Sequence, residues 1–195
     1  MEFIRMAIVY LHLIACCVAI GLVLTNDIAM IKNLFNDEQD MKDDNHLAHL
    51  PRIVSLALIA LWITGLGIIG LDVSTQGTGY LMNPKLQAKV VVVVLLTFNG
   101  FILHKIVLPG LQEARTLLRL DFKARTVAIF TGVVSGVSWF AAALLGVGRP
   151  LNWKYSLTEI LGGLPIVILL GFLAMMVIVA LAMSKRAEPL EQLQR

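Results

Sequence analysis

The feature that most constrains the fold of this chain is a series of five long apolar runs. They cover roughly residues 3–25, 52–71, 86–108, 125–147 and 160–183. A helix rises about 1.5 Å per residue, so about 20 residues cross a hydrocarbon core about 30 Å thick. The chain is 58% hydrophobic and 15% charged, whereas soluble domains are about 45–50% apolar and about 25% charged. The sequence therefore predicts an all-α integral membrane protein, with residues 1–195 forming a single transmembrane domain of five bundled helices.

Lysine and arginine are distributed unevenly between the two sides of this predicted bundle. Eleven of the 16 lie within the segments 26–52, 105–125 and 184–195, and five lie on the opposite side. Because the cytoplasmic side of a membrane protein carries the excess of these residues, we expect the N-terminus outside and the C-terminus in the cytoplasm. This predicts a multi-pass protein of a bacterial inner membrane. Topology accounts for the net charge of +3, so we expect membrane lipid and no nucleic acid as a partner.

Two segments on the predicted cytoplasmic side contain many charged residues. Segment 26–52 contains the acidic run DEQDMKDD, but it lacks the glycine and the terminal glutamate of an EF-hand loop. It is therefore predicted to be a solvated connection. Segment 112–125, QEARTLLRLDFKAR, mixes leucines with basic residues. This pattern predicts a short amphipathic helix at the lipid headgroups.

His12 lies within the first apolar run, and helical phase places it among small and polar residues. With about 100° of rotation per residue, one face carries Arg5, His12, Ala15, Cys16, Ala19, Val23, Asn26 and Asp27. Exposing a central histidine to lipid would be costly, so this face should point toward other helices. His12 is then a metal or haem ligand, a proton relay, or a hydrogen-bonded core residue. These residues alone leave the three alternatives open.

The third run, within NPKLQAKVVVVVLLTFNGFILHK, places Lys89 and His104 on one side of a helix. Lys89 either extends to the headgroups or turns inward toward His12. His46 and His49 are three residues apart before the second run. Together with His104 they are candidates for a metal site or a second haem site, although solvated histidines at a membrane interface are commoner.

The fourth run carries a stripe of small residues, with a tryptophan among them. It comprises Gly132, Ser135, Gly136, Trp139, Ala143 and Gly146, a small-xxx-small pattern that favours tight helix packing or a homodimer. Four further polar residues lie near the predicted span ends, where we expect helix caps or interface residues: Asp27, Asp72, Asn99 and Glu159. The sequence identifies no catalytic residue.

The first three runs resemble a known group of membrane proteins. LHLIACCVAIGLVL, LPRIVSLALIALWITGLGII and NPKLQAKVVVVVLLTFNGFILHK resemble the core of the HemJ-type protoporphyrinogen oxidases and of the related CopD-like copper-resistance domains. The resemblance covers residues of about 8–105. It implies that His12 and Lys89 occupy the positions that bind haem b in that group.

Together, the polar faces and the resemblance predict a haem b-binding redox protein. His12 would be one axial ligand of the haem iron, and Lys89 would be the other ligand or a partner of a haem propionate. His104 is the alternative second ligand. Such a membrane oxidoreductase would pass electrons between a quinone or porphyrin-like substrate and an acceptor. The alternatives are a small metal-handling permease of the CopD-like kind and a non-catalytic accessory subunit.

Overall fold

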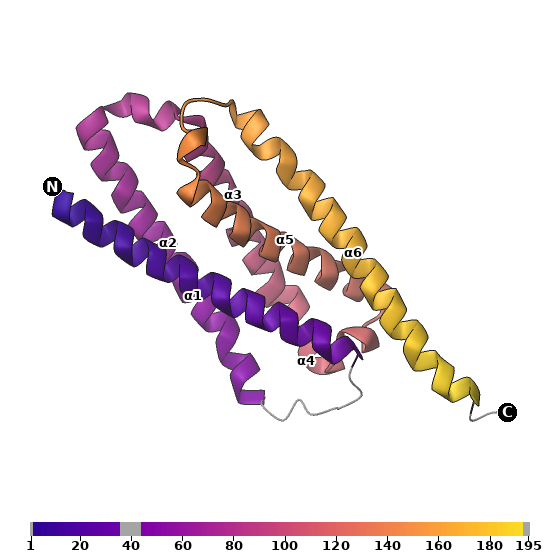
Figure 1. The fold of residues 1–195 in the computed structure, drawn as a ribbon. Coiled ribbons are helices and arrows are strands. Elements are labelled where there is room, and N and C mark those ends of the chain that lie inside the picture. The colour runs from indigo at the N-terminus through magenta and orange to yellow at the C-terminus, as the bar shows by residue number, and fades with distance from the viewer. Residues whose placement is uncertain (1, 36–43, 193–195) are drawn as a thin grey trace.

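The computed structural model describes residues 2–35 and 44–192, apart from the side chains of 44–51, 149 and 186–192. These residues form helices joined by short turns (Figure 1). The elements are α1 (Glu2–Phe35), α2 (Asp44–Gln76), η1 (Thr78–Met82), α3 (Pro84–Ile102), η2 (Leu103–Val107), α4 (Leu108–Ala114), η3 (Leu117–Arg119), α5 (Phe122–Val147), η4 (Arg149–Leu151) and α6 (Leu157–Gln192).

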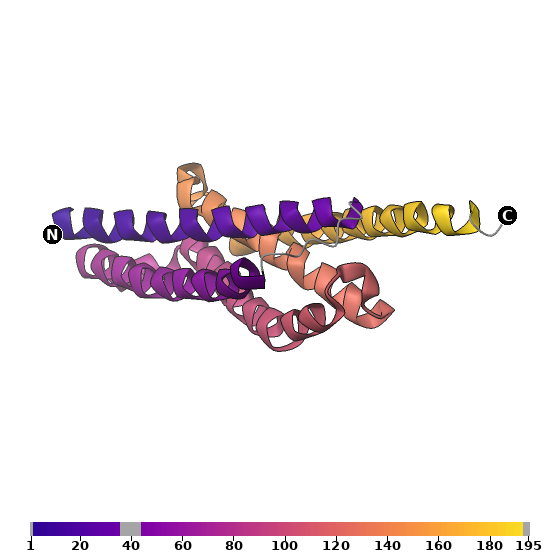
Figure 2. The same cartoon turned by 90° about the horizontal axis from the view of Figure 1, so that it is seen from below.

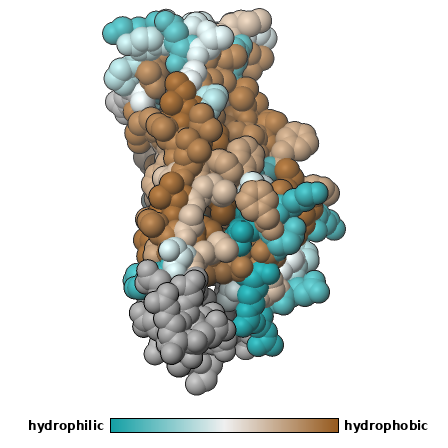
Figure 3. Space-filling model, turned by 90° about the vertical axis from the view of Figure 1, so that its right-hand side faces the viewer, coloured by the Kyte–Doolittle hydropathy of each residue, from teal (hydrophilic) through white to brown (hydrophobic). Residues whose placement is uncertain are grey.

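The predicted all-α membrane fold is confirmed. Five helical stretches of the described chain are long and apolar enough to cross a membrane: Glu2–Phe35, Arg52–Gln76, Pro84–Ala114, Phe122–Val147 and Leu157–Lys185. The two chain ends lie at opposite ends of the bundle (Figure 1), as an odd number of spans requires. In Figure 3, hydrophobic side chains cover the middle of the visible face and hydrophilic ones gather toward its ends. Such a surface is suited to lipid, and the protein is a multi-pass membrane protein.

The helices pack in pairs around a core of mostly small side chains. α1 lies along α2, α3 lies along α5, and α5 also packs against α6. Seen from below, α1 and α6 lie in one layer while α2, α3 and α4 lie in another (Figure 2). Ala19 of α1 and Ala88 of α3 are fully buried in a cluster to which α2 and α5 also contribute. Alanine lets helix backbones approach closely, which stabilises helix pairs in lipid through van der Waals contact.

α1 and α2 are longer than their predicted apolar runs. α1 continues to Phe35 and α2 begins at Asp44, so much of the expected connection over 26–52 is helical. Leu34 explains the extension of α1, because its buried side chain packs with Val107 and Leu117. Burial of this side chain favours helix beyond the stretch needed to cross lipid. Apart from Asp44, the acidic run lies outside the described residues.

The third span is interrupted where the sequence predicts a continuous helix. The turn Leu103–Val107 is a π-helix, in which the N–H of Leu108 bonds to the carbonyl of Leu103. Pro109 explains the wider turn, because proline has no N–H to donate and its ring crowds the preceding turn. The helix resumes as α4 and then ends at Arg115, whose φ of 61° is left-handed.

The prediction of an amphipathic helix over 112–125 is wrong. After α4 the chain makes the single 3₁₀ turn η3, and α5 begins behind Asp121, whose Oδ1 accepts a hydrogen bond from the N–H of Ala124 at 3.3 Å. Leu117 is buried against Ile129 and Val179 instead of facing the headgroups. Burial of this leucine in the bundle therefore outweighs the local amphipathic pattern.

A capping box starts α6, as expected for Glu159 at a span end. The N–H and the hydroxyl of Ser156 both donate to Oε2 of Glu159, each at 2.8 Å. In return, the N–H of Glu159 donates to Oγ of Ser156 at 3.3 Å. These reciprocal bonds satisfy amide groups that the first helical turn leaves without partners.

Gly171 provides a test of the α5–α6 packing. A Cβ added at Gly171 would lie 2.9 Å from Cγ1 of Val133, whereas one added at Gly162, on the same helix, would meet nothing within 4 Å. We expect Gly171→Ala to destabilise the protein by about 1–3 kcal/mol through overpacking. Gly162→Ala should be neutral or stabilising by up to about 1 kcal/mol. Thermal unfolding in detergent measures both, and equal melting temperatures would contradict this packing.

Candidate functional site

His12 is held by a hydrogen bond between α1 and α2. Its Nδ1 lies 2.7 Å from Oγ1 of Thr64, and the Thr64 hydroxyl donates to the carbonyl of Ala60 at 2.6 Å. Because a hydroxyl has one hydrogen, Oγ1 accepts from Nδ1–H of the histidine. Nδ1 of the imidazole is therefore protonated in this arrangement, and in the neutral ring Nε2 carries the lone pair.

The Nε2 edge of His12 makes no hydrogen bond within the described part of the chain. The ring is half-buried and borders Gly65, where an added Cβ would lie 3.6 Å from its Cε1. Metal-binding histidines are arranged in this way, with one ring nitrogen fixed by a hydrogen bond and the other presented to the metal. His12 thus faces another helix, as the helical phase predicts.

Asp72 of α2 forms an ion pair with Arg5 of α1. The carboxylate accepts from Nε of Arg5 at 2.8 Å and from Nη2 at 3.4 Å. Asp72 is only 3% exposed and interacts electrostatically with Tyr80 of η1. Burial, followed by the Asp72 carboxylate, raises the pKa of Tyr80, so its hydroxyl remains a donor at neutral pH. Asp72, expected as a cap or interface residue, instead joins two helices.

Two lysines of α3 lie near this group, Lys89 and Lys85. Lys89 is half-buried and within electrostatic range of both His12 and Asp72, and Lys85 interacts electrostatically with Lys89. This position favours the inward orientation of Lys89. We call Arg5, Asp72, Tyr80, Lys85 and Lys89 the cationic cluster, because it contains three basic side chains and one carboxylate.

His104 lies elsewhere, on the π-helical turn η2. Its Nδ1 is 2.8 Å from the carbonyl of Gly100, and its Nε2 is 3.3 Å from Oγ of Ser55. Ser55 and Thr64, the α2 partners of the two histidines, are nine residues apart, or about 13 Å along the helix. Metal–imidazole bonds are about 2.0 Å long. The structure therefore does not bring His104 and His12 to one iron.

The remaining predicted ligands receive no test from the structure. His46 and His49 lie in the first turns of α2, but their side chains are outside the description. Their role as metal or second haem ligands stays a prediction. Among the described residues, no three His, Cys, Asp or Glu side chains gather into a metal-binding group.

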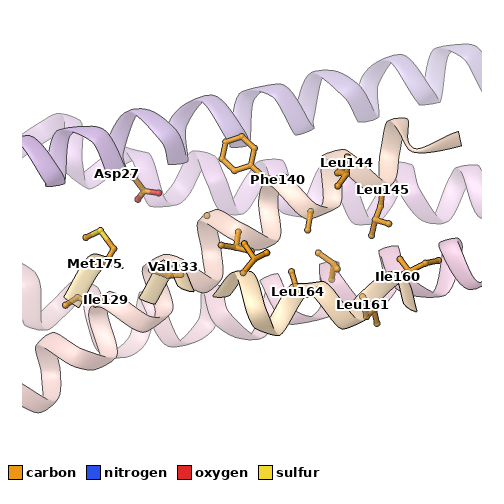
Figure 4. Close-up of a pocket in the computed structure, with 18 of the residues that line it drawn as sticks. Asp27, Ile129, Val133, Phe140, Leu144, Leu145, Ile160, Leu161, Leu164 and Met175 are labelled. Carbon is orange, nitrogen blue, oxygen red and sulfur yellow. The ribbon is translucent and has the colours of Figure 1, made fainter. Parts of the chain in front are cut away.

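A large apolar cavity, which the sequence analysis did not predict, lies between α5 and α6. Its volume is about 1020 Å³. Figure 4 shows Asp27 of α1 pointing toward it, near Val133 and Met175. Gly132 and Gly136 of the predicted small-residue stripe also line it, so this part of the stripe borders an internal space.

Asp27 is not a residue of a span end, contrary to expectation. Its Oδ2 would lie 3.4 Å from a Cβ added at Gly136, near the middle of α5. The helical phase of the first run indicates this position, because it places Asp27 on the same inward face as His12. The length of α1 was the missing information.

Comparisons of the chain with protein-family models, with curated proteins and with solved structures find no match.

The Arg5–Asp72 pair should be a measurable link between α1 and α2. We expect Arg5→Gln to lower the free energy of unfolding by about 1–3 kcal/mol, because it leaves Asp72 buried with one partner fewer. In a double-mutant cycle with Asp72→Asn, thermal unfolding should give a coupling energy of about 0.5–3 kcal/mol. Strictly additive effects of the two substitutions would contradict the pairing.

Proposed function

We propose that this chain is a haem b-binding redox protein of a bacterial inner membrane, with its N-terminus outside and with His12 as an axial ligand of the haem iron. The observation that carries the proposal is the contact between His12 and Thr64. It fixes the Nδ1–H tautomer and leaves the Nε2 lone pair available. Neutral imidazole is a common axial ligand of haem iron.

The other residues around His12 fit a haem as well. Gly65 places no side chain against the imidazole edge, and the cationic cluster has an excess of positive charge beside it. Haem propionates are carboxylates, which basic side chains bind through charge-assisted hydrogen bonds. This supports Lys89 as a partner of a propionate in preference to a second iron ligand.

Each side chain then has a defined task. Thr64 holds the imidazole in one tautomer and orientation, and such outer contacts raise the basicity of a ligand. Asp72 limits the repulsion among the basic side chains, and Arg5 ties it to α1. Haem bound here would supply one-electron chemistry. The lipid-facing surface makes a quinone or a porphyrin-like compound the expected membrane substrate.

The absorption spectrum of the purified protein tests this proposal. Protein expressed with ample haem should show a b-type Soret band, with an α band after dithionite reduction and about one haem per chain. His12→Ala should abolish these bands. His104→Ala is the matched control and should retain them, because His104 contacts α2 elsewhere. A colourless wild-type protein, or an unchanged spectrum in His12→Ala, would overturn the assignment.

Thr64→Val separates orientation of the ligand from ligation itself. The valine keeps the shape of threonine but cannot accept the Nδ1–H bond of His12. We expect haem affinity to fall about 10–100-fold, as is usual when such a second partner is lost. Haem titration of the apoprotein measures this loss. Thr97→Val on α3 is the control: it removes the hydroxyl that accepts the hydrogen bond from Trp62 of α2, and it should leave haem affinity unchanged.

A further inference from the structure

The cavity between α5 and α6 is a second site, separate from the proposed haem ligand. Asp27 and His12 are 15 residues apart on α1, or about 22 Å along its axis. The volume of about 1020 Å³ is at the upper end of the range for small-molecule pockets, about 300–1,000 Å³. Leu144 and Val167 line the cavity and are 64% and 52% exposed, so its wall continues into the lipid-facing surface.

The charged groups of the cavity are acidic. Asp27, Glu159 and Tyr155 are its ionisable lining residues, and no lysine, arginine or histidine side chain lines it in the described chain. Glu159 is engaged by Ser156 in the capping box. Asp27 has no hydrogen bond or ion pair with any described residue.

The position of Asp27 makes it a polar end of a mostly apolar space. Figure 4 shows its carboxylate directed from α1 toward Val133 and Met175. A charge in apolar surroundings is costly unless a partner neutralises it. Gly132 and Gly136 leave room beside this carboxylate, where larger side chains would fill the cavity.

We propose that this cavity binds a lipophilic cation, a molecule with a bulky apolar body and one positive charge. The cationic centre pairs with Asp27, and the body lies between α5 and α6 over the glycines. Charge complementarity favours this class over a neutral hydrophobe, because only a cation supplies the missing partner of the carboxylate.

Binding of tetraphenylphosphonium to the full-length protein in detergent, measured by equilibrium dialysis, tests the proposal. Asp27→Asn keeps the size of the side chain and removes its charge, so affinity should fall at least about tenfold. Glu113→Gln, which removes an exposed acid on α4, should bind like the wild type.

A pair of glycine substitutions on α5 tests the location. A Cβ added at Gly132 or at Gly146 would meet nothing within 4 Å, so we expect both variants to fold, and thermal unfolding checks this. Gly132 lines the cavity and Gly146 does not. Gly132→Leu should therefore weaken binding at least about tenfold, whereas Gly146→Leu should leave it unchanged.

Several results would overturn the proposal. These are no saturable binding to the wild type, equal affinity of Asp27→Asn and wild type, and equal losses in Gly132→Leu and Gly146→Leu. Triphenylmethane, a neutral hydrophobe, serves as a competitor. If it displaces the cation equally well from wild type and from Asp27→Asn, the site selects apolar bulk alone. Asp27→Asn should have the same Soret band as the wild type. Loss of cation binding can therefore be distinguished from loss of haem binding.

Discussion

Hydrocarbon offers no water to polar groups, so the polar atoms of a chain in lipid must find partners within the protein. For the backbone this requirement imposes helices. For side chains it imposes contacts between helices, and these contacts run through the bundle. Arg5 bonds to Asp72 between α1 and α2, Trp62 donates to Thr97 between α2 and α3 at 3.0 Å, and Asn99 donates to the carbonyl of Thr131 between α3 and α5 at 2.9 Å. The bundle is thus joined by polar bonds as well as by close packing.

The same requirement shapes the candidate site. The bond from His12 to Thr64 satisfies one ring nitrogen and leaves the other without a partner in the described chain. The hydrogen bonds from Arg5 satisfy the buried carboxylate of Asp72. Lys89, which is half-buried beside them, adds positive charge. A neutral imidazole is suited to bind the iron of haem, and the excess of basic side chains beside it is suited to bind the haem propionates. For these two reasons haem is the group we propose.

Small residues have two opposite effects in this bundle. The alanines of the cluster that α1, α2, α3 and α5 share are buried, because the helices close around them. Gly171 likewise lies against Val133. Gly132 and Gly136 border the cavity, as Gly171 does on the facing helix. The small-residue stripe of α5 is therefore not one continuous packing surface. Whether a small residue is tightly packed or borders the cavity depends on how closely the facing helix approaches at that position.

The sequence by itself determined the five spans, the inward face of α1 and the cap role of Glu159, because hydropathy, helical phase and capping boxes depend on residues close together in the chain. Tertiary structure decided that Lys89 is half-buried within electrostatic range of His12, that His104 contacts α2 far from His12, and that Asp27 faces the middle of α5. It also decided that Leu117 enters the core instead of forming a surface helix. These features depend on which helices meet and how far each extends. Packing between residues distant in the sequence determines both the helix pairs and the helix lengths. The residue pattern along one helix does not identify the helices that pack against it.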